Sequence, residues 1–98
     1  MKLYRAMCKQ ELDRTLKFNS LDWNSKYKWF GSYEFVKSRV KDGNFNNSKF
    51  VTDRYTHLLE ITVDDSSMNY FKFNGKEYML CVRDVPMVKI LEFKVVDS

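Results

Sequence analysis

The order of helix-type and strand-type segments constrains this chain more than any other feature. Both helix-type segments lie in the first half, and the second half is a succession of strand-type segments. Two helices among five or six strands, without βαβα alternation along the whole chain, indicate the α+β class. We therefore predict a small, strongly curved or split, mainly antiparallel sheet with two helices.

The predicted strands are rich in β-branched and aromatic residues. They cover Lys2–Met7, Lys28–Phe30, Tyr55–Val63, Tyr70–Phe73, Glu77–Arg83 and Val88–Val96. Asn74-Gly75 is a typical hairpin turn, and it joins the fourth and fifth of these strands. Pro86 marks a break between the last two.

The first predicted helix, Lys9–Lys17, has Leu12 and Leu16 four positions apart. Its charged residues are expected to turn outward: Glu11, Asp13 and Arg14. Residues 41–53, which are rich in Asn, are predicted to form a loop.

The second predicted helix, Tyr33–Val40, follows Ser32, a residue that can cap it. Glu34 lies in its first turn, where a carboxylate is favourable. We expect its buried stripe to consist of Phe35, Val36 and Val40. The strand residues beneath it would be either Leu58 or the set Leu59, Ile61 and Val63.

Length and composition predict one domain spanning residues 1–98, since 98 residues suffice for one core but not for two. A hydrophobic content of 44% and an aromatic content of 16% argue against intrinsic disorder. No stretch approaches the roughly 18 apolar residues of a membrane span, and Met1–Lys9 lacks the apolar core of a signal peptide. We therefore expect no membrane partner and a cytoplasmic location.

Cysteine and histidine content gives no pattern for a metal site. Cys8 and Cys81 are far apart, and His57 is the single histidine, whereas zinc sites use paired ligand spacings. We predict two reduced structural thiols and no metal, with a disulfide between the first strand and a late one as the alternative. His57 alternates with apolar residues in its strand and is predicted to line the core or a groove.

The net charge of +4 is mild, and the basic residues are spread evenly without a Lys/Arg run. This distribution gives weak support for nucleic-acid binding. It would still attract a pyrophosphate or an acidic protein, or simply favour solubility. Twelve Lys, seven Asn and eight Phe against one Ala suggest an AT-rich coding sequence, such as that of a phage with a low-GC host.

Three short segments carry residues suited to chemistry. The first-strand segment is Leu3–Met7, the serine segment is Lys28–Ser32, and the glutamate segment is Asn74–Leu80. Each has an ordinary structural explanation: Arg5 as a salt-bridge partner, Ser32 as a helix cap, and Glu77 as a solvated carboxylate.

In this order and at these separations, the three segments resemble the ADP-ribosyltransferase superfamily. That superfamily includes the poly(ADP-ribose) polymerases, the mono-ADP-ribosylating toxins and the RNA 2′-phosphotransferases. The matching residues are Leu3-Tyr4-Arg5, Trp29-Phe30-Gly31-Ser32 and Glu77-Tyr78-Met79-Leu80. Thr56–Val63 is similar to the family's central strand and Val85–Val95 to its last, so the resemblance spans nearly the whole chain.

The resemblance implies NAD as cofactor and a cleft shared by Arg5, Ser32 and Glu77. Glu77 would stabilise the cationic ribose that forms when the nicotinamide bond breaks. Arg5 would hold a ribose or the pyrophosphate, and Ser32 would brace the site. Further cofactor contacts are implied for Tyr4, Trp29, Phe30, Tyr33 and Tyr78.

The chain departs from the family pattern in ways that bear on catalysis. Gly31-Ser32-Tyr33 replaces the usual Ser-Thr-Ser, and Gly75 stands where a second acidic or amide residue often precedes the catalytic Glu by two positions. Two functions follow. The first is a phage-encoded anti-defence inhibitor of the anti-CRISPR type, which binds a host protein stoichiometrically in the host cytoplasm. The alternative is an active NAD-dependent mono-ADP-ribosyltransferase that modifies a host macromolecule.

A third interpretation is a binder of single-stranded nucleic acid that uses Trp23, Trp29 and the tyrosines for stacking. It is the weakest of the three, because no Arg/Lys cluster accompanies these aromatic residues in the sequence.

Overall fold

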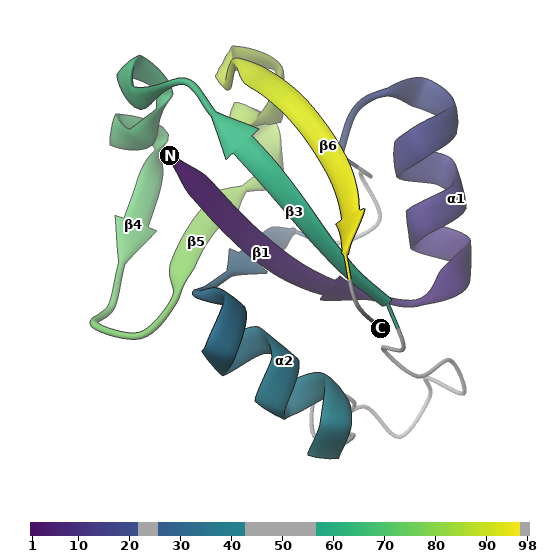
Figure 1. The fold of residues 1–98 in the computed structure, drawn as a ribbon. Coiled ribbons are helices and arrows are strands. Elements are labelled where there is room, and N and C mark those ends of the chain that lie inside the picture. The colour runs from purple at the N-terminus through teal and green to yellow at the C-terminus, as the bar shows by residue number, and fades with distance from the viewer. Residues whose placement is uncertain (22–25, 43–56, 97–98) are drawn as a thin grey trace.

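Two three-stranded antiparallel sheets form the frame of the molecule (Figure 1). The computed structural model describes residues 1–21, 26–42 and 57–96. Sheet A contains, in spatial order, β1 (Lys2–Met7), β3 (His57–Val63) and β6 (Ile90–Val96). Sheet B contains, in spatial order, β2 (Tyr27–Phe30), β5 (Tyr78–Cys81) and β4 (Phe71–Phe73). The α+β class is thus confirmed, with six described strands divided between two sheets.

One β-bridge joins the two sheets within the described chain. Tyr4 of β1 and Gly31, just after β2, exchange backbone hydrogen bonds of 3.0 and 2.9 Å. The six strands therefore do not form one continuous ladder, because the contact between the sheets is limited to this point.

The layers follow from the alternation of side chains along the strands of sheet A. Leu3 and Met7 of β1 and Leu59 of β3 face sheet B and belong to the main core. Ala6 and Leu58 face the opposite way, toward α2. The main core also contains residues from sheet B and the flanking segments: Phe30, Phe71, Leu80 and Val85.

Helix α1 (Lys9–Phe18) lies at the other end of sheet A from the β4–β5 hairpin (Figure 1). It ends at Asn19, which adopts a left-handed φ of 50° and donates its N–H to the carbonyl of Thr15. Its buried residues are Glu11, Leu12 and Thr15. The prediction that Glu11 turns outward was therefore wrong.

Helix α2 (Tyr33–Asp42) covers the second face of sheet A (Figure 1). Ser32 caps it as predicted, because its Oγ accepts a hydrogen bond of 3.2 Å from the backbone N–H of Phe35. Val36 is buried over Ala6 and Leu58, which decides in favour of Leu58 as the residue beneath the helix. Phe35 is only half-buried, and the side chain of Val40 lies outside the described residues.

The second half departs from prediction at the ends of three strands, β4, β5 and β6. Tyr70 was predicted in a strand but ends the 3-10 helix η1 (Asp65–Tyr70). Asp64 accounts for this turn, because its carboxylate accepts hydrogen bonds from the backbone N–H and the hydroxyl of Ser66. A second 3-10 helix, η2 (Val82–Met87), contains Pro86 and shortens both strands that flank it.

The predicted hairpin between β4 and β5 is confirmed. Gly75 has a φ of 98°, which glycine adopts without strain. The Asn74 side-chain oxygen accepts hydrogen bonds from the N–H groups of Lys76 and Glu77, which fixes the turn. The predicted loop was to begin at Lys41, but Lys41 and Asp42 still belong to α2, and the rest of that loop, with Tyr55 and Thr56, lies outside the described residues.

Truncating Leu59 should destabilise the fold strongly, because this side chain is 0% exposed between the two sheets. We expect Leu59→Ala to lower the free energy of unfolding by about 2–5 kcal/mol. Leu91→Ala on β6 is the matched control, since Leu91 is 57% exposed and its truncation should change stability by less than about 0.5 kcal/mol. Urea denaturation of both variants measures the difference, and equal losses would contradict the layer assignment.

Candidate functional site

A hollow of about 480 Å³ lies where the start of β1, the junction between β2 and α2, and the β4–β5 turn come together. All three motif segments contribute to it or adjoin it. Its lining consists of Met1, Lys2, Leu3, Gly31, Ser32, Phe35, Phe73, Gly75, Lys76 and Tyr78.

Backbone pairing explains why distant parts of the sequence meet here. The bridge between Tyr4 and Gly31 joins the first-strand and serine segments. Phe30 is paired with Tyr78, which joins the serine and glutamate segments. A Cβ atom on Gly31 would lie 3.1 Å from side-chain atoms of both Phe35 and Val36, so the missing side chain lets α2 approach the strands closely.

The lining combines cations with aromatic rings. Lys2 and Lys76 are its cationic residues, with the Lys2 ammonium group 3.6 Å from Glu60 Oε1, and Ser32 carries a hydroxyl. The rings of Phe73 and Tyr78 lie 4.6 Å apart between centroids. Among the described residues, the lining contains no Asp, Glu or Arg. Such a surface suits an anionic or planar group.

Ser32 and Tyr78 are the two predicted site residues that line this hollow. Glu77 is adjacent to Tyr78 and half-buried, but it is not part of the lining. Its backbone N–H binds Asn74, and its carboxylate forms no hydrogen bond or ion pair within the described residues. The structure therefore brings the serine and glutamate segments together without placing the Glu77 carboxylate in the hollow.

Arg5 lies in a buried ion pair instead of in the hollow. Its Nε donates to Glu11 Oε2 at 2.8 Å and its Nη2 to Glu11 Oε1 at 3.2 Å. Its Nη1 donates to the backbone carbonyl of Trp29 at 3.1 Å, and the guanidinium carbon lies 5.8 Å from the Phe30 ring centroid. These contacts link β1 to α1 and β2, which is the structural role that a strand Arg most often has.

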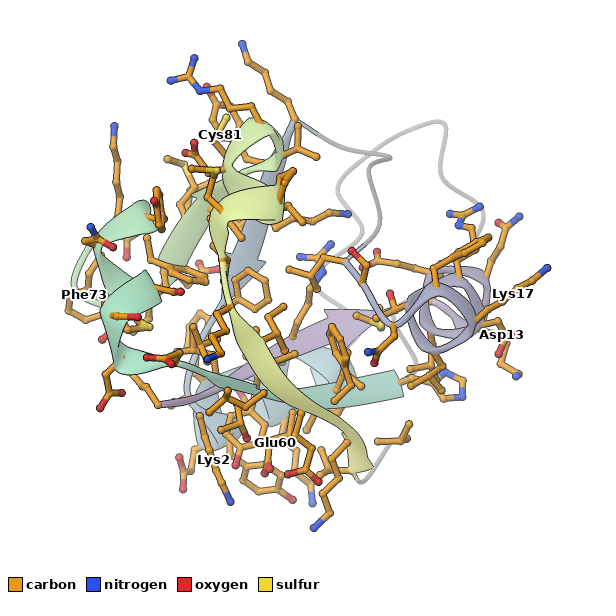
Figure 2. All side chains as sticks on the ribbon, turned by 90° about the horizontal axis from the view of Figure 1, so that it is seen from above. Lys2, Asp13, Lys17, Glu60, Phe73 and Cys81 are labelled. Atoms are coloured by element: carbon orange, nitrogen blue, oxygen red, sulfur yellow. The ribbon has the colours of Figure 1, made fainter. Side chains whose placement is uncertain are left out.

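Tyr4 and Tyr33 lie together on the α2 side of sheet A. Their rings meet edge to face with centroids 5.4 Å apart. The Tyr4 hydroxyl donates to Glu60 Oε2 at 2.8 Å, and Lys2 Nζ lies 3.6 Å from Glu60 Oε1. Figure 2 shows Lys2 and Glu60 on the same side of the sheet. Neither tyrosine lines the hollow.

The Glu60 carboxylate changes the acidity of Tyr4. The hydrogen bond to Glu60 raises the pKa of Tyr4 above its ordinary value of 10.0, and burial acts in the same direction. Removing the phenol proton would place a second negative charge beside the carboxylate.

Trp29 and Phe30 point to opposite faces of sheet B, since they are consecutive in β2. Phe30 is buried in the core, whereas Trp29 is 41% exposed on the outer face. Neither lines the hollow.

Sequence reasoning missed the buried polar residues. Glu11 and Glu60 are buried, and Lys28 is only 1% exposed on the inner face of β2. A signal for Glu11 was present, because an Arg in a strand needs a carboxylate and Glu11, six positions later, lies in the first turn of the next helix. Glu60 and Lys28 carry no comparable signal.

Cys8 and Cys81 are both free thiols, and His57 is half-buried. In the described ranges, no group of three or more Cys, His, Asp and Glu side chains is placed to hold a metal ion. No helix in the same ranges has the length and apolar character needed to cross a membrane.

Comparison with protein-family models, curated proteins and solved structures gives no match to this chain.

Removing one partner of the Arg5–Glu11 pair should be costly. We expect Glu11→Ala to lower the free energy of unfolding by about 3–5 kcal/mol, because it leaves a guanidinium buried without its counter-charge. The double variant Arg5→Met with Glu11→Leu should recover most of that loss. The control is Asp13→Ala, which breaks the exposed Lys9–Asp13 pair on the same helix and should cost about 0.3–0.5 kcal/mol. Equal losses in Glu11→Ala and Asp13→Ala by urea denaturation would contradict the role given to Arg5.

The Tyr4–Glu60 hydrogen bond should make stability depend on alkaline pH. The raised pKa of Tyr4 means that the folded protein holds this proton more tightly than the unfolded chain. The associated stability is fully present below pH 10.0 and is lost as the pH rises through the folded pKa. The free energy of unfolding of the wild type should therefore fall more steeply above pH 10.0 than that of Tyr4→Phe, and parallel profiles would show that the bond does not contribute.

Proposed function

We propose that this chain is a phage-encoded, ADP-ribosyltransferase-like binding protein that inhibits a host defence factor by stoichiometric association. It would be an anti-defence protein of the anti-CRISPR type. The observation that carries the proposal is the hollow, to which all three motif segments contribute but whose described lining residues include no carboxylate and no guanidinium.

The scaffold supports the family part of the proposal. The described elements run strand, helix, strand, helix and then four strands, and three of these four, β3, β5 and β6, fall in segments that the resemblance covers. The β layer is split into two antiparallel sheets. The bridge at Gly31 and the pairing of Phe30 with Tyr78 join the serine segment to the other two.

The chemistry argues against turnover. Cleavage of the nicotinamide–ribose bond develops positive charge on the ribose, and an enzyme must place negative charge beside it. The charged side chains among the described lining residues are those of Lys2 and Lys76, both cationic. Arg5 is occupied by Glu11, and Gly75 offers no side chain to activate an acceptor.

An acidic surface on a host protein fits the charge of the chain. Its net charge is +4, and the hollow presents lysines together with the exposed ring of Phe73. Such a site can accept a carboxylate and an apolar side chain of a partner. A stoichiometric inhibitor acts by covering a surface of its partner, so this contact would be sufficient for inhibition.

The active mono-ADP-ribosyltransferase remains the alternative, and Glu77 is the observation in its favour. The residue is adjacent to Tyr78 of the lining, and its carboxylate is not engaged within the described chain. A rotation of this side chain toward the hollow would supply the missing negative charge.

A comparison of wild type with Glu77→Gln distinguishes the two functions. We expect neither protein to add mass to host proteins in the presence of NAD, and both to protect a phage from host defence equally. Lys76→Glu, which reverses a charge in the hollow lining, should abolish protection while leaving the fold intact, because Lys76 is exposed.

The enzyme would give a different result. Wild type would then transfer ADP-ribose, and Glu77→Gln would reduce the rate by about 10²–10³ through loss of one electrostatic contribution. Mass spectrometry of host proteins measures the addition, and NAD titration by calorimetry measures binding. Any transfer by wild type that Glu77→Gln removes would overturn the proposed function.

A further inference from the structure

The outer face of sheet B carries a set of side chains that the hollow does not use. Alternation along the strands turns Tyr27 and Trp29 outward from β2, Met79 and Cys81 outward from β5, and Lys72 outward from β4. Their inner neighbours fill the core, as the burial of Phe30, Phe71 and Leu80 shows. This outer face is therefore separate from the hollow and from the α2 layer.

The register places these residues in two rows. Trp29 is paired with Met79, and Met79 is paired with Lys72, so one row crosses all three strands. Tyr27 is paired with Cys81 in the next row. Figure 2 shows Cys81 on the far side of the molecule from Lys2 and Glu60.

Both aromatic side chains are accessible. Tyr27 is 40% and Trp29 is 41% exposed, although both belong to a paired strand and not to a loop. They are two positions apart on one strand, which separates them by roughly 6.5 Å. A rigid strand thus offers two neighbouring rings on which planar groups can stack.

The charge of this face has one sign in the described strands. Lys72 ends the row that begins at Trp29, and the ammonium group of Lys26 lies 5.5 Å from the Tyr27 ring centroid. The three strands of sheet B contain no Asp or Glu, and Glu77 lies at the hairpin end, before β5 begins. Aromatic rings on an antiparallel sheet with flanking lysines complement bases and phosphates together.

We propose that the outer face of sheet B binds single-stranded nucleic acid, with Trp29 and Tyr27 stacking on successive bases and Lys26 and Lys72 contacting phosphates. The lysines are far apart in the sequence, and strand pairing places them at two different margins of one sheet, Lys26 beside Tyr27 and Lys72 at the end of the Trp29 row, which is why no cluster is visible in the sequence. Binding should depend little on the nucleotide sequence, because every base offers a face for stacking. The inference stands independently of the proposed inhibitor function, since it uses none of the residues that line the hollow.

Fluorescence anisotropy with a short labelled oligothymidylate and a matching oligouridylate tests the proposal on the full chain. We expect wild type to bind both at low salt, and to bind a duplex of the same length more weakly. Trp29→Ala should weaken binding by about 5- to 100-fold, and Trp29→Phe should retain most of it. Lys72→Ala should reduce the slope of log affinity against log salt by about 0.7.

Leu91→Ala is the matched control, because Leu91 is also an exposed hydrophobic residue on a strand but lies on β6 of sheet A. It should bind as wild type does. Circular dichroism shows whether each variant is folded. If Trp29→Ala is unfolded, Tyr27→Ala and Lys72→Ala replace it in the test. The proposal is overturned if wild type fails to bind either oligonucleotide, or if the folded outer-face variants bind with unchanged affinity and salt slope. Failure to bind would leave a protein partner as the occupant of this face.

Discussion

The buried ion pair between Arg5 and Glu11 is the interaction on which the arrangement of this protein depends. One guanidinium holds the carboxylate of α1 and the backbone carbonyl of Trp29, so it links a helix and both sheets from a single position on β1. Hydrophobic burial is non-directional and does not by itself set the orientation of two sheets. The planar donor group of an arginine is directional, and here it sets how β1, α1 and β2 approach one another.

The strand and helix pattern could be predicted largely from the sequence because local features determine it. Alternation predicted β1 with its observed bounds, and Ser32 and Asn74-Gly75 marked a helix start and a hairpin. The division into two sheets could not be predicted in this way. It depends on which strand edges meet, and in the described chain the sheets meet in the bridge between Tyr4 and Gly31, where α2 packs closely against a residue without a side chain.

The directions of the side chains at the site could not be predicted from the sequence, for a related physical reason. The serine and glutamate segments meet through strand pairing, and Ser32 and Tyr78 line the same hollow. The direction in which Arg5, Trp29 and Glu77 point is a property of the folded sheet. Arg5 finds a carboxylate in the core, and Trp29 alternates away from Phe30. A sequence motif predicts where a segment lies in the fold more readily than it predicts the direction in which its side chains point.

Strand β1 has different neighbours on its two faces, and this restricts insertions and deletions within the strand. Leu3, Arg5 and Met7 belong to the core between the sheets, while Tyr4 and Ala6 belong to the layer beneath α2. Inserting or deleting one codon within β1 would exchange the two sets, moving a guanidinium under the helix and a phenol into the core. Length variation should therefore be absent from β1 in any descendant that keeps this fold. Substitutions within β1 that preserve the alternation of its side chains are still compatible with this fold.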